Sequence, residues 1–189
     1  MISLRDNIML ALSESPRTAF NTKSIALLIN EKRDSSLTKK LNYYVQKGLL
    51  LNPRKGIYAK RNYNSEELAG LVFVPSYISL EYVLQKAGVI FQYDSAITSV
   101  SYLSREIEML EQTFRYQQIK GEILYNLEGI ERRDNINVAT PERAILDMMY
   151  LNPECYFDNL NTISKKCIIQ LLPIYQSKRL NERVKELFK

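Results

Sequence analysis

Histidine is absent from the 189 residues, and so is tryptophan. Without histidine the chain has no Ser-His-Asp or Cys-His triad, no HExxH metal site and no imidazole general base. Only six glycines are present, and neither GxxxxGK[ST] nor GxGxxG, the glycine-rich phosphate-binding sequences, occurs. These absences remove most hydrolase chemistry. We therefore expect a binding protein that is not an enzyme and that holds no cofactor and no metal.

Cysteine and long apolar runs are also scarce. The two cysteines, Cys155 and Cys167, form no CxxC pair and so give neither a zinc site nor a disulfide framework. No apolar run approaches the roughly 18 residues that a membrane span requires, and the first six residues lack the charged-then-apolar order of a signal peptide. Hydrophobic residues make up 46% and charged residues 25%, as in a packed globular protein. We expect a cytoplasmic protein with no membrane partner.

Positive charge is concentrated at the start of the chain. Residues 1–65 carry twelve Lys or Arg against four Asp or Glu, formally +8, whereas residues 66–189 carry fourteen against seventeen, formally −3. A compact basic segment joined to a mildly acidic remainder is typical of a nucleic-acid-binding module attached to another domain. A solvated lysine-rich surface would give the same count, so the prediction depends on the secondary structure that carries the charge.

The first 62 residues have the pattern of three short helices. Ser3 and Thr22 can cap the first two, and Ser35 or Ser36 the third, which closes at Lys47-Gly48. The inward stripes recur at helical spacing: Leu4, Ile8, Ala11 and Leu12, then Ile25, Leu28 and Ile29, then Leu37, Leu41, Tyr44 and Val45. A tight polar turn at residues 32–34 separates the second and third helices. The sequence therefore predicts a helix-turn-helix.

A hairpin is expected directly after the third helix. Residues 49–51 are apolar, residues 52–56 (Asn-Pro-Arg-Lys-Gly) form a turn cluster, and residues 57–59 return as a second strand. Three helices followed by a two-stranded wing within about 60 residues predict a winged helix-turn-helix. In a helix-turn-helix the recognition helix, here the third, enters the major groove. We expect the wing tip to lie along the flanking backbone.

The predicted partner is double-stranded operator DNA. Lysines and hydroxyls contact phosphates, whereas Asn42, or Lys39 and Lys40, could read base edges. Winged helices also serve as protein-interaction modules, and an adaptor of that kind is the alternative. The predicted DNA-binding residues are positively charged or rich in hydrogen-bond donors: Lys23, Ser35, Ser36, Thr38, Lys39, Lys40, Asn42, Tyr43, Arg54 and Lys55.

Residues 63–189 predict a small mixed α/β domain with C-terminal helices. We therefore expect an α+β fold class with two domains, at residues 1–62 and 63–189. Helices are expected at 65–73, from a Ser79 cap to Gly88, and from Thr140-Pro141 onward. Strands are expected at 97–102, 113–119, 123–125 and 136–139, and two further helices near 164–172 and 178–188.

No catalytic arrangement is expected in this second segment. Glu142 and Asp147 do not share a helix face, and Arg143 with Asp147 is interpreted as a surface i,i+4 ion pair. Gln118-Ile-Lys120 has glutamine where a nuclease would place its metal-binding acid. A nucleotidyltransferase would need Gly-Ser and two spaced aspartates, which are missing, and most of the thirteen tyrosines are expected to pack in cores.

Several segments together resemble a known family. They are Gly56-Ile-Tyr58, the stretch from Pro75 through Leu80 and Leu84 to Gly88, Ile97-Thr-Ser-Val100 and above all Val138-Ala-Thr-Pro-Glu-Arg-Ala-Ile-Leu-Asp147. In order and spacing they are similar to the AbiEi family of antitoxins and related transcriptional regulators. The resemblance covers residues 1 to about 151. Family members commonly have lysine where Arg143 stands, and residues 152–189 lie outside the resemblance.

The resemblance implies a DNA-binding autorepressor that is also the antitoxin of a type IV toxin-antitoxin system, which acts in abortive infection. It implies an N-terminal winged helix that represses its own operon and an α/β domain that carries the antitoxin activity. The opposed toxin would be a nucleotidyltransferase-like protein, antagonised without a stable complex. A standalone regulator without a toxin is the alternative within the same family, and a degenerate nuclease is a further, weaker one.

Overall fold

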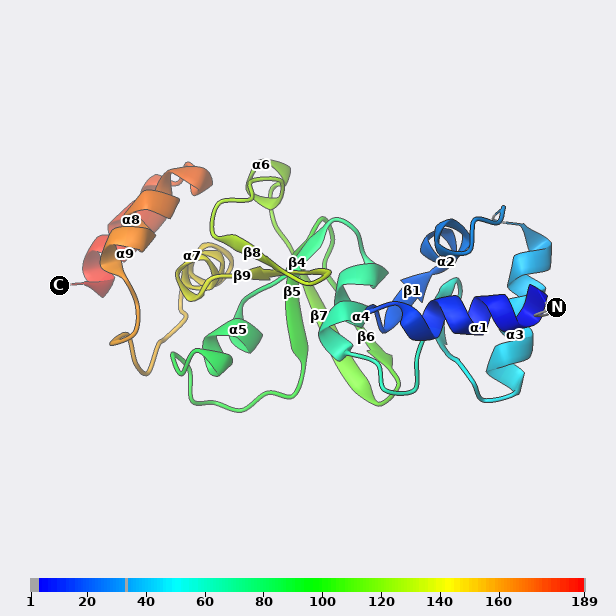
Figure 1. Ribbon diagram of the computed structural model, residues 1–189. Helices are drawn as coiled ribbons and strands as arrows, with labels where there is room; N and C mark the ends of the chain where they lie inside the picture. Colours follow the sequence, from blue (N-terminus) through cyan, green and yellow to red (C-terminus); the bar gives the residue numbers. More distant parts are fainter. Residues whose placement is uncertain (1–3, 33, 189) are drawn as a thin grey trace. The chain divides into compact units, whose positions relative to one another are not determined.

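The computed structural model describes residues 4–32 and 34–188, with side chains from residue 8 on (Figure 1). The predicted Ser3 cap and Arg33 of the predicted polar turn lie outside these residues. The chain divides into two compact units, Met1–Val72 and Phe73–Lys189, and each has its own β-sheet. The fold is therefore mixed, with helices and two separate sheets, which confirms the predicted α+β class at this level.

The first unit contains α1 (Leu4–Glu14), β1 (Ala19–Asn21), α2 (Thr22–Leu28), α3 (Ser35–Gln46), β2 (Leu51–Arg54), β3 (Ile57–Ala59) and α4 (Ser65–Val72). Its three strands form an antiparallel sheet in the order β1-β3-β2. The three predicted helices and the hairpin are present. The short strand β1 was not predicted, because three residues directly before a helix give too short a pattern to recognise.

The apolar stripes of the helices meet in one core. Its buried members are Ile8, Leu12, Phe20, Ile25, Ala26, Leu37, Leu41, Tyr44, Leu50 and Tyr58. Leu28 was predicted to face inward, but it is 43% exposed, and its neighbour Leu27 is 73% exposed. The second helix ends at Leu28 after two turns, so Ile25 and Ala26 fill the space beneath it. Leu28 is thereby left at the surface.

The first unit extends beyond residue 62, where the sequence placed the domain boundary, to Val72. Leu68 and Ala69 on α4 are fully buried. Glu67 Oε2 accepts hydrogen bonds from both the backbone N–H and the hydroxyl of Thr18, each at 2.7 Å. Thr18 directly precedes β1, so α4 is attached to the sheet of the first unit by apolar burial and by a carboxylate that satisfies two donors.

The second unit is built on a six-stranded mixed sheet in the order β6-β7-β5-β4-β9-β8. Its strands are β4 (Ser76–Ile78), β5 (Ile97–Ser101), β6 (Arg105–Met109), β7 (Gln112–Gln118), β8 (Ile130–Arg133) and β9 (Ile136–Ala139). The pairs β5–β7 and β4–β9 are parallel, and the others are antiparallel. Every residue of β5 is buried, which places this strand at the centre of the sheet.

Prediction and structure differ at several elements of this sheet. Residues near 97–102, 113–119 and 136–139 are strands, as expected, whereas β4, β6 and β8 were not predicted. The last two are edge strands with exposed charged residues, so they lack a clear apolar alternation. The predicted strand 123–125 is wrong: Ile123 and Leu124 lie on helix α6 (Gly121–Leu124) and donate to the Lys120 carbonyl.

The remaining helices are α5 (Glu81–Lys86), α7 (Pro141–Leu151), α8 (Lys165–Leu171), the 3-10 helix η1 (Leu172–Tyr175) and α9 (Lys178–Leu187). As predicted, Thr140 caps α7 and Pro141 stands at its start. Ser79 does not cap α5, because its hydroxyl donates to Asp147 at 2.8 Å and the cap position is Leu80. In Figure 1, α7 lies between the sheet on one side and α8 and α9 on the other. Within the described ranges, the helices are too short or too polar to cross a membrane.

Candidate nucleic-acid interface

The third helix owes its orientation to one cap and one apolar stripe. Asp34 is the N-cap, since its Oδ1 accepts from the backbone N–H of Leu37 at 2.9 Å, so neither Ser35 nor Ser36 caps the helix as predicted. Leu37, Leu41 and Tyr44 are buried against the core. Because these positions share one side of the helix, the opposite side faces solvent.

Most of the predicted DNA-binding residues of α3 lie on that exposed side. The exposed set is Ser35, Ser36, Thr38, Lys39, Asn42 and Tyr43. Lys40 differs, because its Nζ lies 3.0 Å from the carboxylate of Glu31 and its side chain is only 26% exposed. Its position at the flank of the helix, next to the end of α2, explains this pairing. Lys40 therefore has a partner within the protein, and Lys39 is the exposed lysine of the helix.

Two side chains in the middle of α3 are oriented by their neighbours. Asn42 Oδ1 accepts from the Tyr58 hydroxyl at 3.4 Å, which places this part of the helix against β3. Tyr43, 41% exposed, meets the Tyr44 ring edge-on, and the Lys47 ammonium lies 5.7 Å from its ring centroid. Lys47 was not among the predicted site residues. Its i,i+4 spacing from Tyr43 was the signal that could have identified it.

The turn between β2 and β3 carries two more of the predicted DNA-binding cations. Asn52 Nδ2 donates to the carbonyls of Arg54 and Ile57, at 2.9 and 2.7 Å, and Gly56 has φ +78°. Such a φ favours glycine, which has no Cβ. The turn thus has a defined shape with Arg54 and the adjacent Lys55 exposed at its tip.

Lys23 is held near this turn through its neighbour in the chain. Both the backbone N–H and the hydroxyl of Thr22 donate to the Gly56 carbonyl, at 3.0 and 3.2 Å. The start of α2, with exposed Lys23, therefore lies beside the turn that carries Lys55. The structure brings the predicted residues into two groups: the outward side of α3, and the cationic group formed by Lys23, Arg54 and Lys55.

Two further cations of the first unit have structural roles. Lys60 Nζ donates to the Ser15 carbonyl at 2.7 Å, just past the carboxyl end of α1, where a positive charge is favoured. Arg61 Nε donates to the Gly48 carbonyl at 2.5 Å, just past the end of α3. Together with Lys40, these residues use part of the +8 charge within the protein. The formal charge of residues 1–65 therefore overstates the charge that faces solvent.

The second unit contains a buried polar network. Arg143 and Asp147 on α7 are both fully buried, with Nε 3.4 Å from Oδ1, so the predicted surface ion pair is wrong. Asp147 accepts hydrogen bonds from the hydroxyls of Tyr175, Ser79 and Tyr77 at 2.6, 2.8 and 3.1 Å. These residues come from η1 and from β4 or its end, so the pair joins three parts of the unit.

Both terminal nitrogens of Arg143 donate hydrogen bonds, whereas its Nε makes none with any described residue and meets Asp147 only as an ion pair. Its Nη1 donates to the Glu128 carbonyl at 2.9 Å, and its Nη2 donates to the Ile123 carbonyl at 2.8 Å. Burial acts to lower the pKa of Arg143, but Tyr175, Asp147 and Tyr77 outweigh it and raise that pKa. Burial also raises the pKa of Tyr77 and of Tyr175, so both phenols stay protonated as donors.

The carboxylates of α7 are both used inside the protein. Asp147 is fully buried, and Glu142 Oε1 accepts from the backbone N–H of Ser164 at 3.1 Å, directly before α8. Burial raises the pKa of Asp147, against the opposing effect of Arg143 and of three hydroxyl donors. Across the described residues no group of three or more Cys, Asp or Glu is arranged to hold a metal ion.

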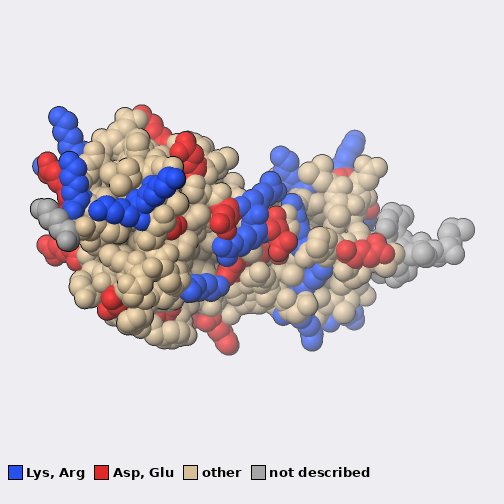
Figure 2. All heavy atoms as spheres, turned by 60° about the vertical axis from the view of Figure 1, so that its left-hand side comes forward, with Lys and Arg blue, Asp and Glu red and all other residues tan. Residues whose placement is uncertain are grey.

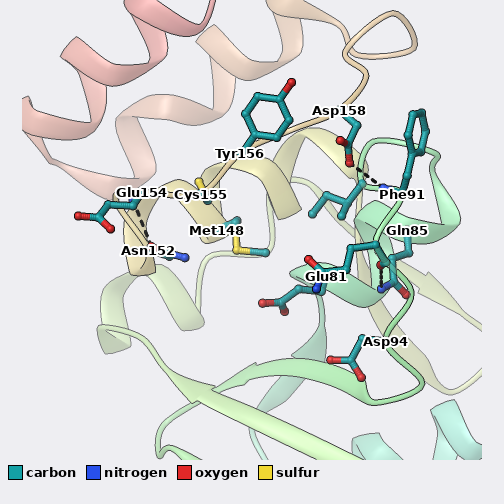
Figure 3. Close-up of a pocket in the computed structure, with 12 residues that line it drawn as sticks. Glu81, Gln85, Phe91, Asp94, Met148, Asn152, Glu154, Cys155, Tyr156 and Asp158 are labelled. Carbon is teal, nitrogen blue, oxygen red and sulfur yellow. Dashed lines mark hydrogen bonds between the residues drawn. The ribbon is translucent and has the colours of Figure 1, made fainter.

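A pocket of about 490 Å³ opens on the second unit, between α5, the end of α7 and two loops (Figure 3). The loops are tied together: Asp158 Oδ2 accepts from the Phe91 N–H at 2.8 Å, and the Asp158 N–H donates to the Val89 carbonyl at 2.9 Å. This site could not be predicted from the sequence, because its residues come from two segments about 60 positions apart with no shared motif. The lining residues are Glu81, Gln85, Ile90, Phe91, Gln92, Asp94, Met148, Asn152, Glu154, Cys155, Tyr156 and Asp158.

Charge is distributed over both units. On the face shown in Figure 2, Lys and Arg side chains occur on each unit, with Asp and Glu among them. Models of known protein families give no match to the chain, and a comparison with curated proteins gives no match either.

Proposed function

We propose that the chain is a sequence-specific DNA-binding transcriptional autorepressor whose first unit is a winged helix-turn-helix. The order of elements supports this proposal: α1, β1, α2, α3 and the hairpin β2–β3, with β1 pairing on β3. In this arrangement α3 is the recognition helix, and the turn with Arg54 and Lys55 is the tip of the wing.

The observation that carries the proposal is the chemistry of the exposed side of α3. The helix contains no Asp or Glu from Ser35 to Gln46. Its solvent side presents hydroxyls, the Asn42 amide and the Lys39 ammonium, which are donors for phosphate oxygens and base edges. A merely solvated helix would tolerate acidic residues there, whereas a helix in the major groove would be repelled by DNA if it carried them.

Salt-dependent DNA binding tests this function. Binding of the purified chain to the DNA upstream of its own gene is measured by fluorescence anisotropy at several salt concentrations. Lys39→Ala and Lys55→Ala should each weaken binding and reduce the log–log salt slope by about 0.9 per lost phosphate contact. Lys40→Ala should change the slope less, because the Lys40 ammonium pairs with Glu31. Lys120→Ala, at an exposed lysine of the second unit, is the control.

Sequence specificity is tested separately. Asn42→Ala should reduce the preference for the upstream DNA over unrelated DNA by about 1–3 kcal/mol if its amide reads a base edge. Lys55→Ala should weaken binding to both DNAs about equally. Unchanged affinity and slope in the Lys39 and Lys55 variants would overturn the DNA-binding proposal.

We extend the proposal to an antitoxin of a type IV toxin-antitoxin system, with a nucleotidyltransferase-like toxin opposed without a stable complex. This part is supported by the resemblance of residues 138–147 to the AbiEi family. The test is whether the reading frame next to this gene encodes such a protein, and whether co-expression of the full chain restores growth when that protein is induced. Failure of rescue with DNA binding intact would leave a standalone regulator.

One observation favours the alternative of a protein-interaction adaptor. Leu27 and Leu28 are exposed on α2 and line a depression of about 310 Å³ together with Phe20 and Arg17. An apolar site of this kind suits a protein side chain better than a phosphate backbone. A stoichiometric protein partner that is lost in Leu27→Ser, together with no DNA binding at low salt, would favour the adaptor.

A further inference from the structure

The pocket of the second unit has a one-sided charge. Four of its twelve lining residues are acidic, and no Lys or Arg is among these described residues. Asp94 forms an ion pair with Arg115 at 2.8 Å, which Arg115 shares with Glu106, and Asp158 accepts a hydrogen bond from the Phe91 N–H. Within the described part of the chain, neither Glu81 nor Glu154 accepts a hydrogen bond from a Lys or Arg side chain. The lining residues therefore contribute the negative charges of Glu81 and Glu154 and no positive charge.

Charge is not the only feature of this site. Glu81 Oε2 is buried and has no hydrogen-bond partner within the described residues, which is costly for a carboxylate oxygen. Phe91 and Tyr156 are 69% and 78% exposed at the pocket, and Met148 and Ile90 add apolar surface. Exposed aromatic rings next to carboxylates attract cations through the ring face as well as through charge.

The site has a defined shape and a suitable size. The Gln85 side chain donates to the Gln92 carbonyl at 2.5 Å, and the Asn152 side chain accepts from the Glu154 N–H at 3.1 Å (Figure 3). Both contacts hold lining segments in place. A volume of about 490 Å³ lies in the range of small-molecule sites.

We propose that this pocket binds an organic cation, with an ammonium or guanidinium group at Glu81 and an alkyl chain against Met148, Phe91 and Tyr156. Arg183 on α9 lowers the pKa of the Cys155 thiol, against the larger raising effect of burial, but it is not among the residues that line the pocket. The cation is either a free amine or a Lys or Arg side chain of another polypeptide. The proposal does not depend on DNA binding.

The test is a titration of the full chain followed by amide NMR, with putrescine, agmatine and a short Gly-Arg-Gly peptide amide as probes and butyrate as an anion of similar length. Ionic strength is kept constant. We expect saturable shifts confined to residues 81–94 and 148–158 with the cations, and none with butyrate. Saturation by putrescine and agmatine identifies a free amine as the ligand, and saturation by the peptide alone identifies a protein side chain.

Variants distinguish binding in the pocket from nonspecific attraction of cations to acidic residues elsewhere on the protein. Glu81→Gln should weaken cation binding about tenfold or more, since it removes a charged acceptor. Phe91→Ala should weaken it by about two- to fivefold, and truncation of this exposed ring spares the fold. Glu108→Gln, on the edge strand β6, removes an exposed acid that does not line the pocket and should have no effect. Equal effects of Glu81→Gln and Glu108→Gln, binding of butyrate, or shifts spread over the unit would overturn the proposal.

Discussion

Arg143 and Asp147 lie one helical turn apart and form an ion pair, with Arg143 Nε 3.4 Å from Asp147 Oδ1. Both side chains are fully buried. Two ions in a protein interior are stable only when hydrogen bonds satisfy their remaining atoms. Here hydroxyls of Tyr77, Ser79 and Tyr175 and two backbone carbonyls do so. The pair thus connects β4, α7, η1 and the residues near α6 in the second unit.

Loss of the Asp147 charge should destabilise the second unit strongly. Asp147→Asn keeps the shape but leaves the Arg143 guanidinium buried without a counter-charge, which costs about 3–5 kcal/mol. The measurement is the urea unfolding free energy by circular dichroism. Glu154→Gln, at an exposed acid, is the control and should change it by less than about 0.5 kcal/mol. A small effect of Asp147→Asn would show that the pair is not needed for stability.

The Tyr175 hydroxyl should contribute measurably to the free energy of unfolding through this network. Tyr175→Phe removes the 2.6 Å donor to Asp147 and leaves a buried acceptor with fewer bonds, at a cost of about 1–3 kcal/mol. Tyr150→Phe is a matched control, because Tyr150 contacts the Tyr175 ring and is only half-buried. Thermal unfolding of both variants would show a lower Tm for Tyr175→Phe alone. Equal Tm values would contradict this role.

The helix α4 should be needed for a stable first unit. A fragment of residues 1–72 keeps Leu68, Ala69 and Glu67, whereas a fragment of residues 1–62 loses them and leaves the Thr18 donors without their acceptor. Burial of one leucine side chain contributes about 1.5–3 kcal/mol. We expect the 1–72 fragment to unfold at higher temperature in circular dichroism. The same midpoint for both fragments would place the boundary at residue 62.

A glycine substitution in the turn between β6 and β7 should stabilise the protein. Leu110 and Glu111 form its turn with φ of +51° and +64°, a conformation that costs a side-chain-bearing residue about 1 kcal/mol. Glu111→Gly should therefore stabilise the chain by about 0.5–1 kcal/mol in urea unfolding. Glu108→Gly, within β6, should do the opposite because glycine weakens an ordinary strand. Destabilisation by both substitutions would show that the turn is not strained.

Asp94 should contribute stability that is lost in acid. The Ala96 N–H and then Arg115 lower the pKa of Asp94, so its contribution is present above the ordinary carboxyl pKa of about 3.9 and is lost as pH falls through the lower folded pKa. Asp94→Asn should be less stable than the parent at about pH 6, and the difference should shrink below about pH 4. Urea midpoints over this range provide the test. A difference independent of pH would contradict it.

Long periodic segments were predictable from the sequence for a simple reason. The apolar stripes of α1 and α3, and the Thr140-Pro141 start of α7, are local signals that tertiary packing does not reverse. Edge strands such as β6 and β8 were missed because one partner strand and many exposed charges leave no alternation to read. The short helix α6 was mistaken for a strand because a four-residue apolar segment has no distinguishing period.

The candidate interface was predictable in part. The exposed side of α3 follows from helical spacing, so Ser35, Lys39 and Asn42 could be named from the stripe of Leu37 and Leu41. The pairing of Lys40 with Glu31 could not, because Glu31 lies in the loop after α2 and meets α3 only in the folded unit. The interpretation of Arg143 and Asp147 failed for a related reason. The i,i+4 spacing shows that they meet, but not which elements cover them.

The sequence by itself determined the basic first unit, the helix faces and the absence of histidine chemistry, because composition and period are properties of neighbouring residues. Only the tertiary structure decided which charges reach solvent. Lys40, Lys60 and Arg61 are bound within the first unit, Arg143 and Asp147 are buried in the second, and the acidic pocket joins segments about 60 residues apart. Burial and pairing depend on elements distant in the chain, and these are set by packing.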